Sequence, residues 1–461
     1  MSEAVVADIL SQGRLYEVGG AVRDSLLVGQ PAVKDRDYLV TGVDYDHLTR
    51  LLRRHGRVDL VGRSFGVIKF TEFTDGLAHT HDISLPRKEH STGWGHKDFE
   101  VNFDPGLSVE DDLVRRDFTI NAMARDLAEN KLIDPLGGFK DLEERQLRMV
   151  GAGSFEEDPL RMLRAIQFAA RFDFDIESET WRAMCEEAET ISSVSPERIQ
   201  EELGKLLTLA ERPSRGFRLM EQSGLLAPIL PELAACVDVA QPGPYHAYDV
   251  FEHTLHAVDA CPPRVRVRLA ALFHDVSKPQ ARRLVDGGAT FYGHETQGAR
   301  VARQALRRLR YSNDMIRDVG ILVERHMFTA EVTDKGMRRL IRRVGVPLIF
   351  DLLDLRRADV VAQGKGGVTE DIDEFEQRIR DELERKPPFS VSDLALDGND
   401  IMELFKIEPG RMVGDILDYL LEQVLDNPEY NTREKLEQLA RAYMRNRHDD
   451  NNTSERKGRD L

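Results

Sequence analysis

The stretch from Val18 to Val40 reads VGGAVRDSLLVGQPAVKDRDYLV and decides how the N-terminal part of the chain folds. It predicts a short strand that turns on two glycines into a helix, followed by a strand that carries Asp35 and Asp37. A turn without Cβ atoms brings backbone N–H groups close to a docked phosphate chain. Alternate residues of a strand share a face, so the two aspartates point together and are suited to hold Mg²⁺. The alternative is an ordinary βαβ start with two solvated aspartates.

The composition is that of a soluble globular protein of 461 residues, of which 41% are hydrophobic and 31% charged. This length predicts about two to four domains. The formal net charge of −17 argues against a protein that coats nucleic acid over its whole surface, but it allows a local basic groove. The three cysteines have no C-x-x-C spacing, and neither a signal peptide nor a membrane-spanning apolar run is present. These features predict a cytoplasmic protein with reduced thiols.

The predicted N-terminal sheet holds further candidates. Asp82 lies on the short strand Thr80–Leu85, where it is a candidate third catalytic carboxylate; a strand-edge aspartate that faces water is the alternative. The polar stretch from Arg87 to Phe103 predicts a mobile loop. Arg115-Arg116-Asp117 then leads into an apolar run, and its arginines are suited to pair with a triphosphate; a solvated helix start is the alternative.

From Asp158 onward the apolar periodicity is helical. Asp158-Pro159 predicts a helix start with an N-cap aspartate followed by proline. Arg161 shares a helix face with Asp158, and Arg164 lies one turn beyond. A carboxylate beside a guanidinium can accept from an exocyclic amino group and donate to the neighbouring ring acceptor, a pair that cytosine and adenine both offer. An N-cap with a surface ion pair is the alternative.

Several short motifs occur in order along this part of the chain. They are Gly19-Gly20-x-x-Arg23-Asp24 with Asp35-Arg36-Asp37, Arg115-Arg116-Asp117, Asp134-Pro135-x-x-Gly138, Glu157-Asp158-x-x-Arg161 and Arg198-Ile199-x-x-Glu202-Leu203. The ordered set resembles the bacterial-type (class II) CCA tRNA nucleotidyltransferase and poly(A) polymerase family. The resemblance implies an α+β fold, with a small polymerase-β-like nucleotidyltransferase head followed by a mostly α-helical neck.

The resemblance also implies roles for individual residues. Asp35 and Asp37 would hold two Mg²⁺ ions, of which one activates the 3′-hydroxyl of an RNA and the other neutralises the triphosphate as pyrophosphate leaves. Some nucleotide-binding residues would contact the triphosphate, and others would form a protein template for CTP and ATP. Gly20 and Arg23 would contact the triphosphate, and Arg116 and Asp117 would bind the same nucleotide. The template would consist of Asp158, Arg161 and Arg164.

The region from Tyr245 to Asp359 holds most of the histidines and predicts a second site, because imidazoles and carboxylates form a divalent-metal site when helices bring them together. The spacing resembles the HD phosphohydrolase superfamily, with Ser277 where a glycine is common. The expected metal ligands are His253, His274, Asp275 and Asp359, and the expected phosphate contacts are Lys278, His294 and His326, the two histidines being alternative extra ligands. Unrelated core or surface histidines are the alternative, and the metal stays open among Ni, Co, Mn, Fe and Mg-like ions.

Breaks at proline and glycine set the expected domain boundaries. The domains are a head over residues 1–145, a helical neck over 146–240, an HD domain over 241–385, a C-terminal helical region over 386–447 and a disordered tail over 448–461. Two predicted helices carry clustered arginines, which are candidate tRNA contacts or else solvated faces. These are Arg300, Arg303, Arg307, Arg308 and Arg310 in one, and Arg338, Arg339, Arg342 and Arg343 in the other.

The sequence therefore predicts an RNA enzyme with two activities. Its head adds C and A nucleotides to tRNA 3′ ends from CTP and ATP, and its HD domain is a metal-dependent phosphatase or 2′,3′-cyclic phosphodiesterase. The alternatives are a CC-adding or an A-adding specialist, a poly(A) polymerase, and an RNA-binding regulatory protein without enzyme activity. The expected partners are tRNA, ATP and CTP, with no membrane, for a monomer or a homodimer.

Overall fold

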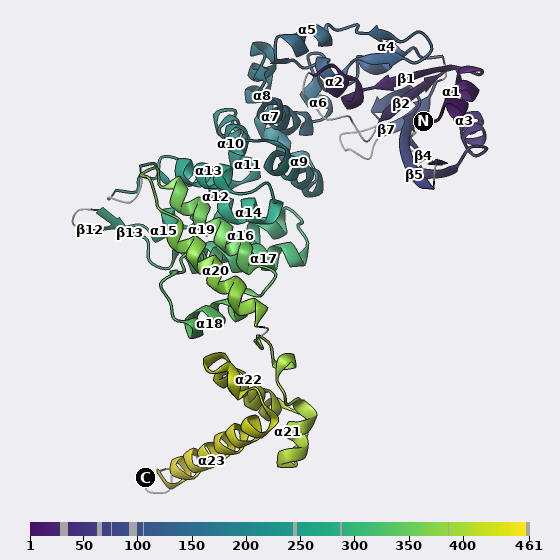
Figure 1. Ribbon diagram of the computed structural model, residues 1–461. Helices are drawn as coiled ribbons and strands as arrows, with labels where there is room; N and C mark the ends of the chain where they lie inside the picture. Colours follow the sequence, from purple (N-terminus) through teal and green to yellow (C-terminus); the bar gives the residue numbers. More distant parts are fainter. Residues whose placement is uncertain are drawn as a thin grey trace. The chain divides into compact units, whose positions relative to one another are not determined.

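The computed structural model describes residues 1–27, 36–61, 67–74, 76–91, 99–104, 106–242, 247–285, 288–385 and 387–457. Asp35 lies outside these ranges. The chain forms two compact units, Met1–Ile229 and Leu230–Leu461 (Figure 1). Unit 1 contains a sheet and the helices that follow it, and unit 2 is almost entirely helical in its described residues. This architecture confirms the predicted α+β fold with a small sheet-containing head.

A seven-stranded sheet forms the head, with strand order β3-β4-β5-β2-β1-β8-β9. Neighbouring strands are antiparallel except β2 and β5, which are parallel. The strands are β1 Arg14–Val18, β2 Asp37–Thr41, β3 Arg57–Val61, β4 Val67–Thr74, β5 Leu77–Ser84, β8 Ala124–Asp126 and β9 Lys131–Ile133. Because β2 lies in the middle of this order, its first residue, Asp37, has a paired strand on either side.

The two faces of the sheet are covered by different helices. Leu15 of β1 and Val40 of β2 are buried in the cluster that includes residues of α1 Glu3–Leu10 and α3 Tyr45–Leu52. Tyr16 and Leu39, one position along each strand, are buried in a second cluster with residues of α4 Val109–Leu113. This alternation is the period of two expected for a sheet that is buried on both faces.

The other elements of the head are α2 Gly20–Leu26, β6 Arg87–Ser91, β7 Phe99–Phe103, the 3₁₀ helix η1 Thr119–Asn121 and α5 Gly138–Glu143. The prediction of a loop from Arg87 to Phe103 is wrong at both ends of that stretch, because β6 and β7 pair antiparallel. The two strands of such a ribbon are joined by backbone hydrogen bonds. A polar sequence without alternating apolar residues therefore gives no indication that the strands form. Residues 92–98, between the two strands, lie outside the described ranges.

The neck is mostly helical, as predicted. They are α6 Ser154–Glu157, α7 Leu160–Phe172, α8 Ser178–Glu187, α9 Pro196–Leu209, α10 Pro213–Gln222 and α11 Leu226–Ile229, with 3₁₀ helix η2 Ala188–Ser193 and a short parallel pair, β10 Gln146–Leu147 and β11 Asp175–Ile176. Oδ1 of Asp158 accepts the N–H of Leu160 at 3.2 Å and so caps α7, as expected.

Unit 2 contains α12 Pro231–Ala234, α13 Val250–Ala260, α14 Val265–Phe273, α15 Lys278–Ala281, β12 Arg283–Val285, β13 Gly288–Thr290, α16 His294–Arg308, α17 Asn313–Arg325, α18 Asp334–Val344, α19 Ile349–Ala362, α20 Glu370–Glu384, η3 Val391–Asp393, α21 Gly398–Phe405, α22 Arg411–Asp426, η4 Pro428–Tyr430 and α23 Arg433–Lys457. Helices α13, α14, α17 and α19 pack against one another. The tail from His448 was expected to be disordered, yet the backbone of α23 continues as helix to Lys457.

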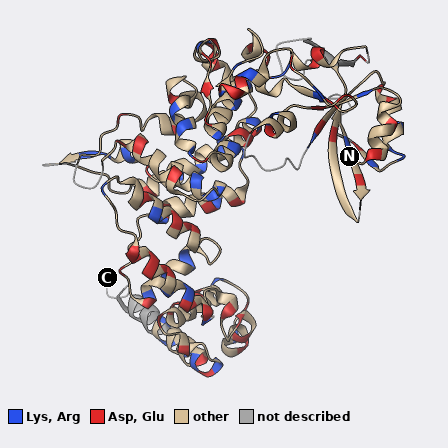
Figure 2. Ribbon diagram, turned by 45° about the horizontal axis from the view of Figure 1, so that its top comes forward, with Lys and Arg blue, Asp and Glu red and all other residues tan. Residues whose placement is uncertain are grey.

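Basic and acidic residues are interspersed along the helices of both units (Figure 2). Among the described residues, none of the helices combines the length and apolarity needed to cross a bilayer.

Gly138, of the Asp134-Pro135-x-x-Gly138 motif, lies where α5 approaches η1. Asp134 accepts the N–H of Gly138 at 2.7 Å and so caps the helix. A Cβ at Gly138 would lie 2.1 Å from the carbonyl oxygen of Thr119, which is backbone and has no rotamer by which to withdraw. We expect Gly138→Ala to lower the free energy of unfolding of unit 1 by about 1–3 kcal/mol.

Urea unfolding of the full chain, followed by circular dichroism, measures this effect. Gly151→Ala is the matched control, because a Cβ at Gly151 meets no atom within 4 Å. An unfolding midpoint for Gly138→Ala equal to that of Gly151→Ala would contradict the steric argument.

Candidate active sites

Two acidic candidates of the head lie side by side on the parallel strands. Asp37 is the first residue of β2 and is exposed, and Asp82 of β5 is its partner in the register. Residues in register on neighbouring strands share a face of the sheet. Lys69 of β4 reaches the same carboxylate, with its Nζ 3.4 Å from Oδ1 of Asp82. The structure thus brings together Asp37 and Asp82, the described part of the predicted carboxylate site.

The glycine turn has a physical requirement at Gly19. Its φ of 68° lies in the left-handed region, and a Cβ there would come within 2.7 Å of Nη1 of Arg116. Arg116 is held in place by Asp112, whose Oδ2 accepts from Nη2 at 3.0 Å and from Nε at 3.2 Å. The Arg115-Arg116-Asp117 motif therefore places a guanidinium against the turn that was predicted to receive a triphosphate. Gly20 begins α2 directly behind this turn.

Arg23, in contrast, is buried. Its Nη1 donates to Oδ1 of Asn121 at 2.6 Å and its Nε to Oδ1 of Asp24 at 2.7 Å. The face of its guanidinium lies over the rings of Phe168 and Phe172 in α7, at 5.2 and 4.6 Å from the centroids. Burial lowers the pKa of Arg23 from its ordinary value. These contacts join the head to the neck, and the triphosphate contact expected for Arg23 stays a prediction.

Asp117, which is buried, and Arg164, which is half-buried, form an ion pair between the head and α7. Oδ2 of Asp117 accepts from Nη2 of Arg164 at 2.7 Å and from Nε at 2.9 Å. The other oxygen accepts from Nδ2 of Asn121 and the N–H of Phe118. Burial raises the pKa of Asp117, but the pairing with Arg164 outweighs burial and lowers it overall. Oε1 of Glu202, a residue of the last sequence motif, lies 3.4 Å from Nη1 of Arg164, so Arg164 pairs with two carboxylates.

The two template candidates have separate partners. Asp158 has an extended backbone, with φ of −147°, and precedes α7. It therefore does not share a helix face with Arg161, and the prediction that it does is wrong. Its carboxylate accepts from Arg198 at 2.7 and 3.1 Å. Arg161 donates to Oγ of Ser154 at 2.9 Å and to the carbonyl of Arg115 at 3.0 Å. Arg198 belongs to the last of the sequence motifs, and the spacing of that motif does not indicate its pairing with Asp158.

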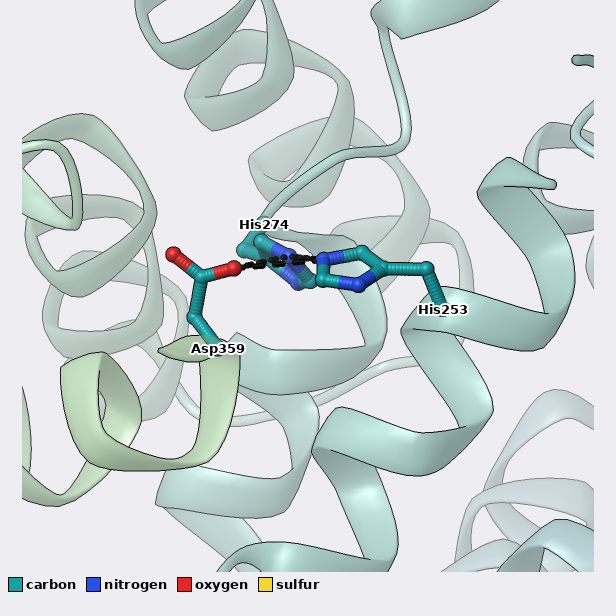
Figure 3. Close-up of side chains that lie close together, drawn as sticks. All are labelled: His253, His274 and Asp359. Atoms are coloured by element: carbon teal, nitrogen blue, oxygen red, sulfur yellow. Dashed lines mark hydrogen bonds and ion pairs between the residues drawn. The ribbon is translucent and has the colours of Figure 1, made fainter. Parts of the chain in front are cut away.

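A second cluster lies in unit 2, where helices bring four imidazoles together. Two of them, His253 and His274, lie beside Asp359 in Figure 3. His253 comes from α13, His274 from the end of α14, His294 from the start of α16 and His326 from the end of α17. Each Nδ1 lies 2.6–3.2 Å from a backbone carbonyl oxygen, to which it donates. A ring whose Nδ1 donates in this way keeps its Nε2 lone pair for a metal.

The cluster forms two groups of candidate ligands that meet at Asp275. His253, His274 and Asp359 form the first group, and His294, His326 and Asp275 form the second. Oδ2 of Asp275 lies 3.3 and 3.2 Å from Nε2 of His253 and His274, and its Oδ1 lies 3.3 Å from Nε2 of His294. Burial lowers the pKa of His326 to about 3, which keeps it neutral as a ligand must be. Nε2 of His294 and His326 lie close enough to Asp275 for a shared metal site. Both roles expected for these histidines, extra ligand and phosphate contact, stay predictions.

The electrostatics of this cluster suit a cation. Burial lowers the pKa of His253, but pairing with Asp275 and Asp359 outweighs it and raises the pKa to about 9. Burial raises the pKa of both carboxyls, and the surrounding imidazoles more than reverse this and hold both pKa values below the ordinary range. Lys278 lies 2.6 Å from Oδ2 of Asp275 and donates to Gln241 at 2.6 Å. A divalent metal would take the place of the His253 proton, and buried carboxylate oxygens beside imidazole nitrogens are a donor set that fits such metals.

Comparison with known proteins gives this geometry its context. Residues 15–148 match the poly A polymerase head domain, 173–237 the probable RNA and SrmB-binding site of polymerase A, and 293–440 the putative domain 2 of tRNA nucleotidyltransferase. A multifunctional CCA protein of Herminiimonas arsenicoxydans is 38% identical over 320 residues, which are 68% of this chain and 72% of the relative. One of Ralstonia nicotianae is 40% identical over 324 residues, covering 68% and 71%. The chain belongs to the multifunctional CCA protein family.

Solved structures agree with this membership at the level of the fold. The CCA-adding enzyme of Bacillus stearothermophilus in complex with CTP has a TM-score of 0.69 at 23% identity, covering 97% of this chain and 98% of that one. That of Thermotoga maritima, complexed with tRNA, has a TM-score of 0.53 at 22% identity, covering 95% and 94%. The family predicted from the sequence motifs is confirmed, and the HD resemblance stays a prediction.

The arginines of α18 do not have the free surface expected of a tRNA contact in this CCA family member. Arg338 is buried and donates to Glu382 and to the carbonyl of Leu425. Arg339 and Arg342 pair with acidic residues of α22, leaving Arg343 as the exposed member of the group. On α16 the prediction stays open: Arg300, Arg303 and Arg307 line a shallow cavity of about 280 Å³, whereas Arg308 pairs with Glu232 and Arg310 also has a partner.

The pair between Asp117 and Arg164 predicts a pH-dependent stability. The folded pKa of Asp117 is lower than the unfolded pKa, so its contribution is present above about pH 4 and is lost as the pH falls through the folded pKa. We expect Asp117→Asn to lower the free energy of unfolding by about 1–3 kcal/mol at neutral pH, because it removes the closer of the two carboxylates that pair with Arg164. This difference from wild type should shrink in acid.

Urea unfolding at neutral pH and at about pH 3 measures this difference. Asp175→Asn is the control, since it removes an exposed pair with Arg215 in the same unit. A difference between Asp117→Asn and wild type that is equally large in acid would rule out the ionised pair as its source.

Proposed function

We propose that this protein adds C, C and A to the 3′ end of tRNA, using CTP and ATP. The observation that carries the proposal is the pairing of Asp37 and Asp82 in register, in a chain whose relatives are named multifunctional CCA proteins. The adjoining glycine turn is covered by Arg116, which supplies the positive charge that a triphosphate needs. The cysteines of the chain are free thiols, and we propose that the enzyme acts in the cytoplasm.

In this mechanism Asp37, Asp82 and Asp35 hold the catalytic cations. Side-by-side carboxylates supply the hard oxygen ligands that Mg²⁺ prefers, so the described pair fits the metal. Bound Mg²⁺ would activate the RNA hydroxyl and neutralise the charge of the leaving group. The 3′-oxygen of the RNA attacks the α-phosphorus, the bond to the β-phosphate oxygen breaks, pyrophosphate leaves, and the hydroxyl proton passes to solvent. Arg116 and the backbone of Gly20 hold the triphosphate in line.

The template for the incoming base is proposed to be Asp158 and Arg161. In the structure Asp158 is occupied by Arg198, and Arg161 by Ser154 and the carbonyl of Arg115. When cytosine or adenine binds, the Asp158 carboxylate and the Arg161 guanidinium would each exchange one of these hydrogen bonds for one to the base edge. The number of hydrogen bonds that each side chain makes would then stay the same. Arg164 acts on this site indirectly, because its pair with Asp117 fixes α7 against the head.

A second activity is supported by the cluster in unit 2. We propose that it would hold two divalent metal ions, one at each group of candidate ligands, and that it hydrolyses phosphate esters at RNA or nucleotide ends. Such ions would supply a hydroxide nucleophile and neutralise the phosphoryl group. Water attacks the phosphorus, the bond from phosphorus to the ribose oxygen breaks, and that oxygen takes a proton as phosphate is released. Lys278, held by Asp275 and Gln241, adds positive charge beside the reacting phosphate.

Removing one head carboxylate tests the first activity. We expect Asp37→Asn to reduce incorporation of labelled CTP and ATP into tRNA lacking its CCA end by at least about 1,000-fold, because a metal ligand is lost. Asp59→Asn is the control, since Asp59 lies on β3 of the same sheet and pairs with Arg57. Absence of incorporation by the wild-type enzyme with Mg²⁺ would overturn the proposal, as would an unaffected Asp37→Asn.

The metal content of unit 2 tests the second activity. After loading with nickel and dialysis we expect about two ions per chain, because the ligands form two groups. His253→Ala and His294→Ala remove a ligand from different groups, and each should lower the content by about one. His256→Ala is the control on the same helix as His253, where it stacks on Tyr248. Elemental analysis that finds no bound metal, or the same content in all variants, refutes the proposed centre.

A further inference from the structure

Glu17 is a buried carboxylate on β1, a strand inside the sheet of the head. In the register of β1 with β2, Glu17 lies opposite Tyr38, and Val18 lies opposite Asp37. Because successive residues of a strand point to opposite faces, Glu17 and Asp37 lie on opposite faces of the sheet. Glu17 is therefore not part of the carboxylate site formed by Asp37 and Asp82. A buried charge is costly unless it is paired, so its partner has to be identified.

The partner of Glu17 is the arginine that lies between the two aspartates of the D-R-D motif. Nη1 of Arg36 lies 3.3 Å from Oε1 of Glu17, and among the described residues no other cation pairs with this carboxylate. The Glu17 side chain is buried, whereas that of Arg36 is exposed. An apolar residue could fill such a strand position without the cost of burying a charge, so stability alone does not explain the pair. The place where the pair holds the guanidinium is the more informative feature.

An arginine that directly precedes an aspartate can reach the carboxylate of that aspartate. Two helices of this chain contain such a pair, with nitrogen–oxygen distances of 2.7 Å for Arg23 with Asp24 and 2.9 Å for Arg317 with Asp318. Arg36 directly precedes Asp37, but its ion pair is with Glu17 on the other face. A guanidinium at Asp37 would compete for the oxygens that Mg²⁺ needs, because both cations bind carboxylates.

We propose that Glu17 is a positioning residue for nucleotidyl transfer, which holds Arg36 on the far face of the sheet and so prevents its guanidinium from competing with Mg²⁺ for Asp37. The inference rests on the metal-binding role proposed for Asp37 and Asp82. Glu17 acts through Arg36 alone, since it lies on the face away from the metal site. Glu17 therefore lowers the Mg²⁺ concentration that the enzyme requires and leaves its maximal rate unchanged.

The Mg²⁺ dependence of CTP incorporation into tRNA lacking its CCA end tests this role. We expect Glu17→Gln to raise the Mg²⁺ concentration at half-maximal rate about three- to fivefold, the effect of an exposed ion pair, while kcat at saturating Mg²⁺ stays within about twofold. Glu17→Asp withdraws the carboxylate by one methylene and should give a smaller rise. Adding Arg36→Gln to Glu17→Gln removes the competing cation, so this double variant should regain the Mg²⁺ dependence of wild type.

Glu17→Gln combined with Arg125→Gln is the matched control. Arg125 lies in register with Glu17 on β8 and donates to Asn130, so its removal takes away the same charge without removing the competitor. This combination should not restore the Mg²⁺ dependence. An unchanged Mg²⁺ dependence in Glu17→Gln, or restoration by both second changes or by neither, would overturn the proposal. Urea unfolding checks that each variant is folded, and Glu17→Asp with the same second changes replaces Glu17→Gln if the latter does not fold.

A binding measurement separates this inference from the transferase function. The Kd of CTP in Mg²⁺, measured by calorimetry, should rise about three- to fivefold in Glu17→Gln and return with Arg36→Gln, and in EDTA it should not change. If wild type incorporates no CTP but binding follows this pattern, the role of Glu17 stands and the transferase function falls. If wild type incorporates CTP and Glu17→Gln changes neither the Mg²⁺ dependence nor the Kd, the role of Glu17 is refuted and the transferase function stands. If incorporation and the binding pattern are both absent, both proposals fall.

Discussion

The ion pair between the buried Asp117 and the half-buried Arg164 is the interaction on which unit 1 depends. It lies in a row of contacts along one side of α7, since Arg161, Arg164, Phe168 and Phe172 all meet the head. These residues are spaced at three and four positions, so they share a helix face. The helix that begins beside the template is therefore fixed to the head over its whole length, and its distance from the catalytic strands follows from packing rather than from a flexible link.

The fold of the head and the positions of the two sites could be predicted because their signals are local. A glycine pair, a D-R-D strand and an H-D doublet at a helix end are readable from neighbours in the sequence. The partners of Asp158 and Arg164 could not be predicted in this way, since Arg198 and Asp117 are separated from them by 40 and 47 residues. Side chains so far apart in sequence meet only through the fold, which one sequence does not display.

The same limit explains what was missed in unit 2. The sequence indicated the ligand types, but whether His294 binds metal or phosphate depends on how α16 meets α14. The arginines of α18 illustrate the converse case, because a cluster of charge suggests a partner outside the chain. Here the partner of Arg338 lies inside it, on α20 and at the end of α22. A charged helix face therefore has to be compared with the acidic residues of its own fold before RNA is invoked.

The backbone carbonyls that hold the histidine rings have one more consequence. His274, His294 and His326 each donate to the carbonyl three residues earlier, and His253 donates to the end of α19. Orientation and tautomer are therefore set by helix geometry, before any ion arrives. A small zinc domain needs its metal in order to fold, whereas this centre is assembled by the packing of its helices. The shape of the proposed centre would therefore be the same whichever divalent metal bound to it.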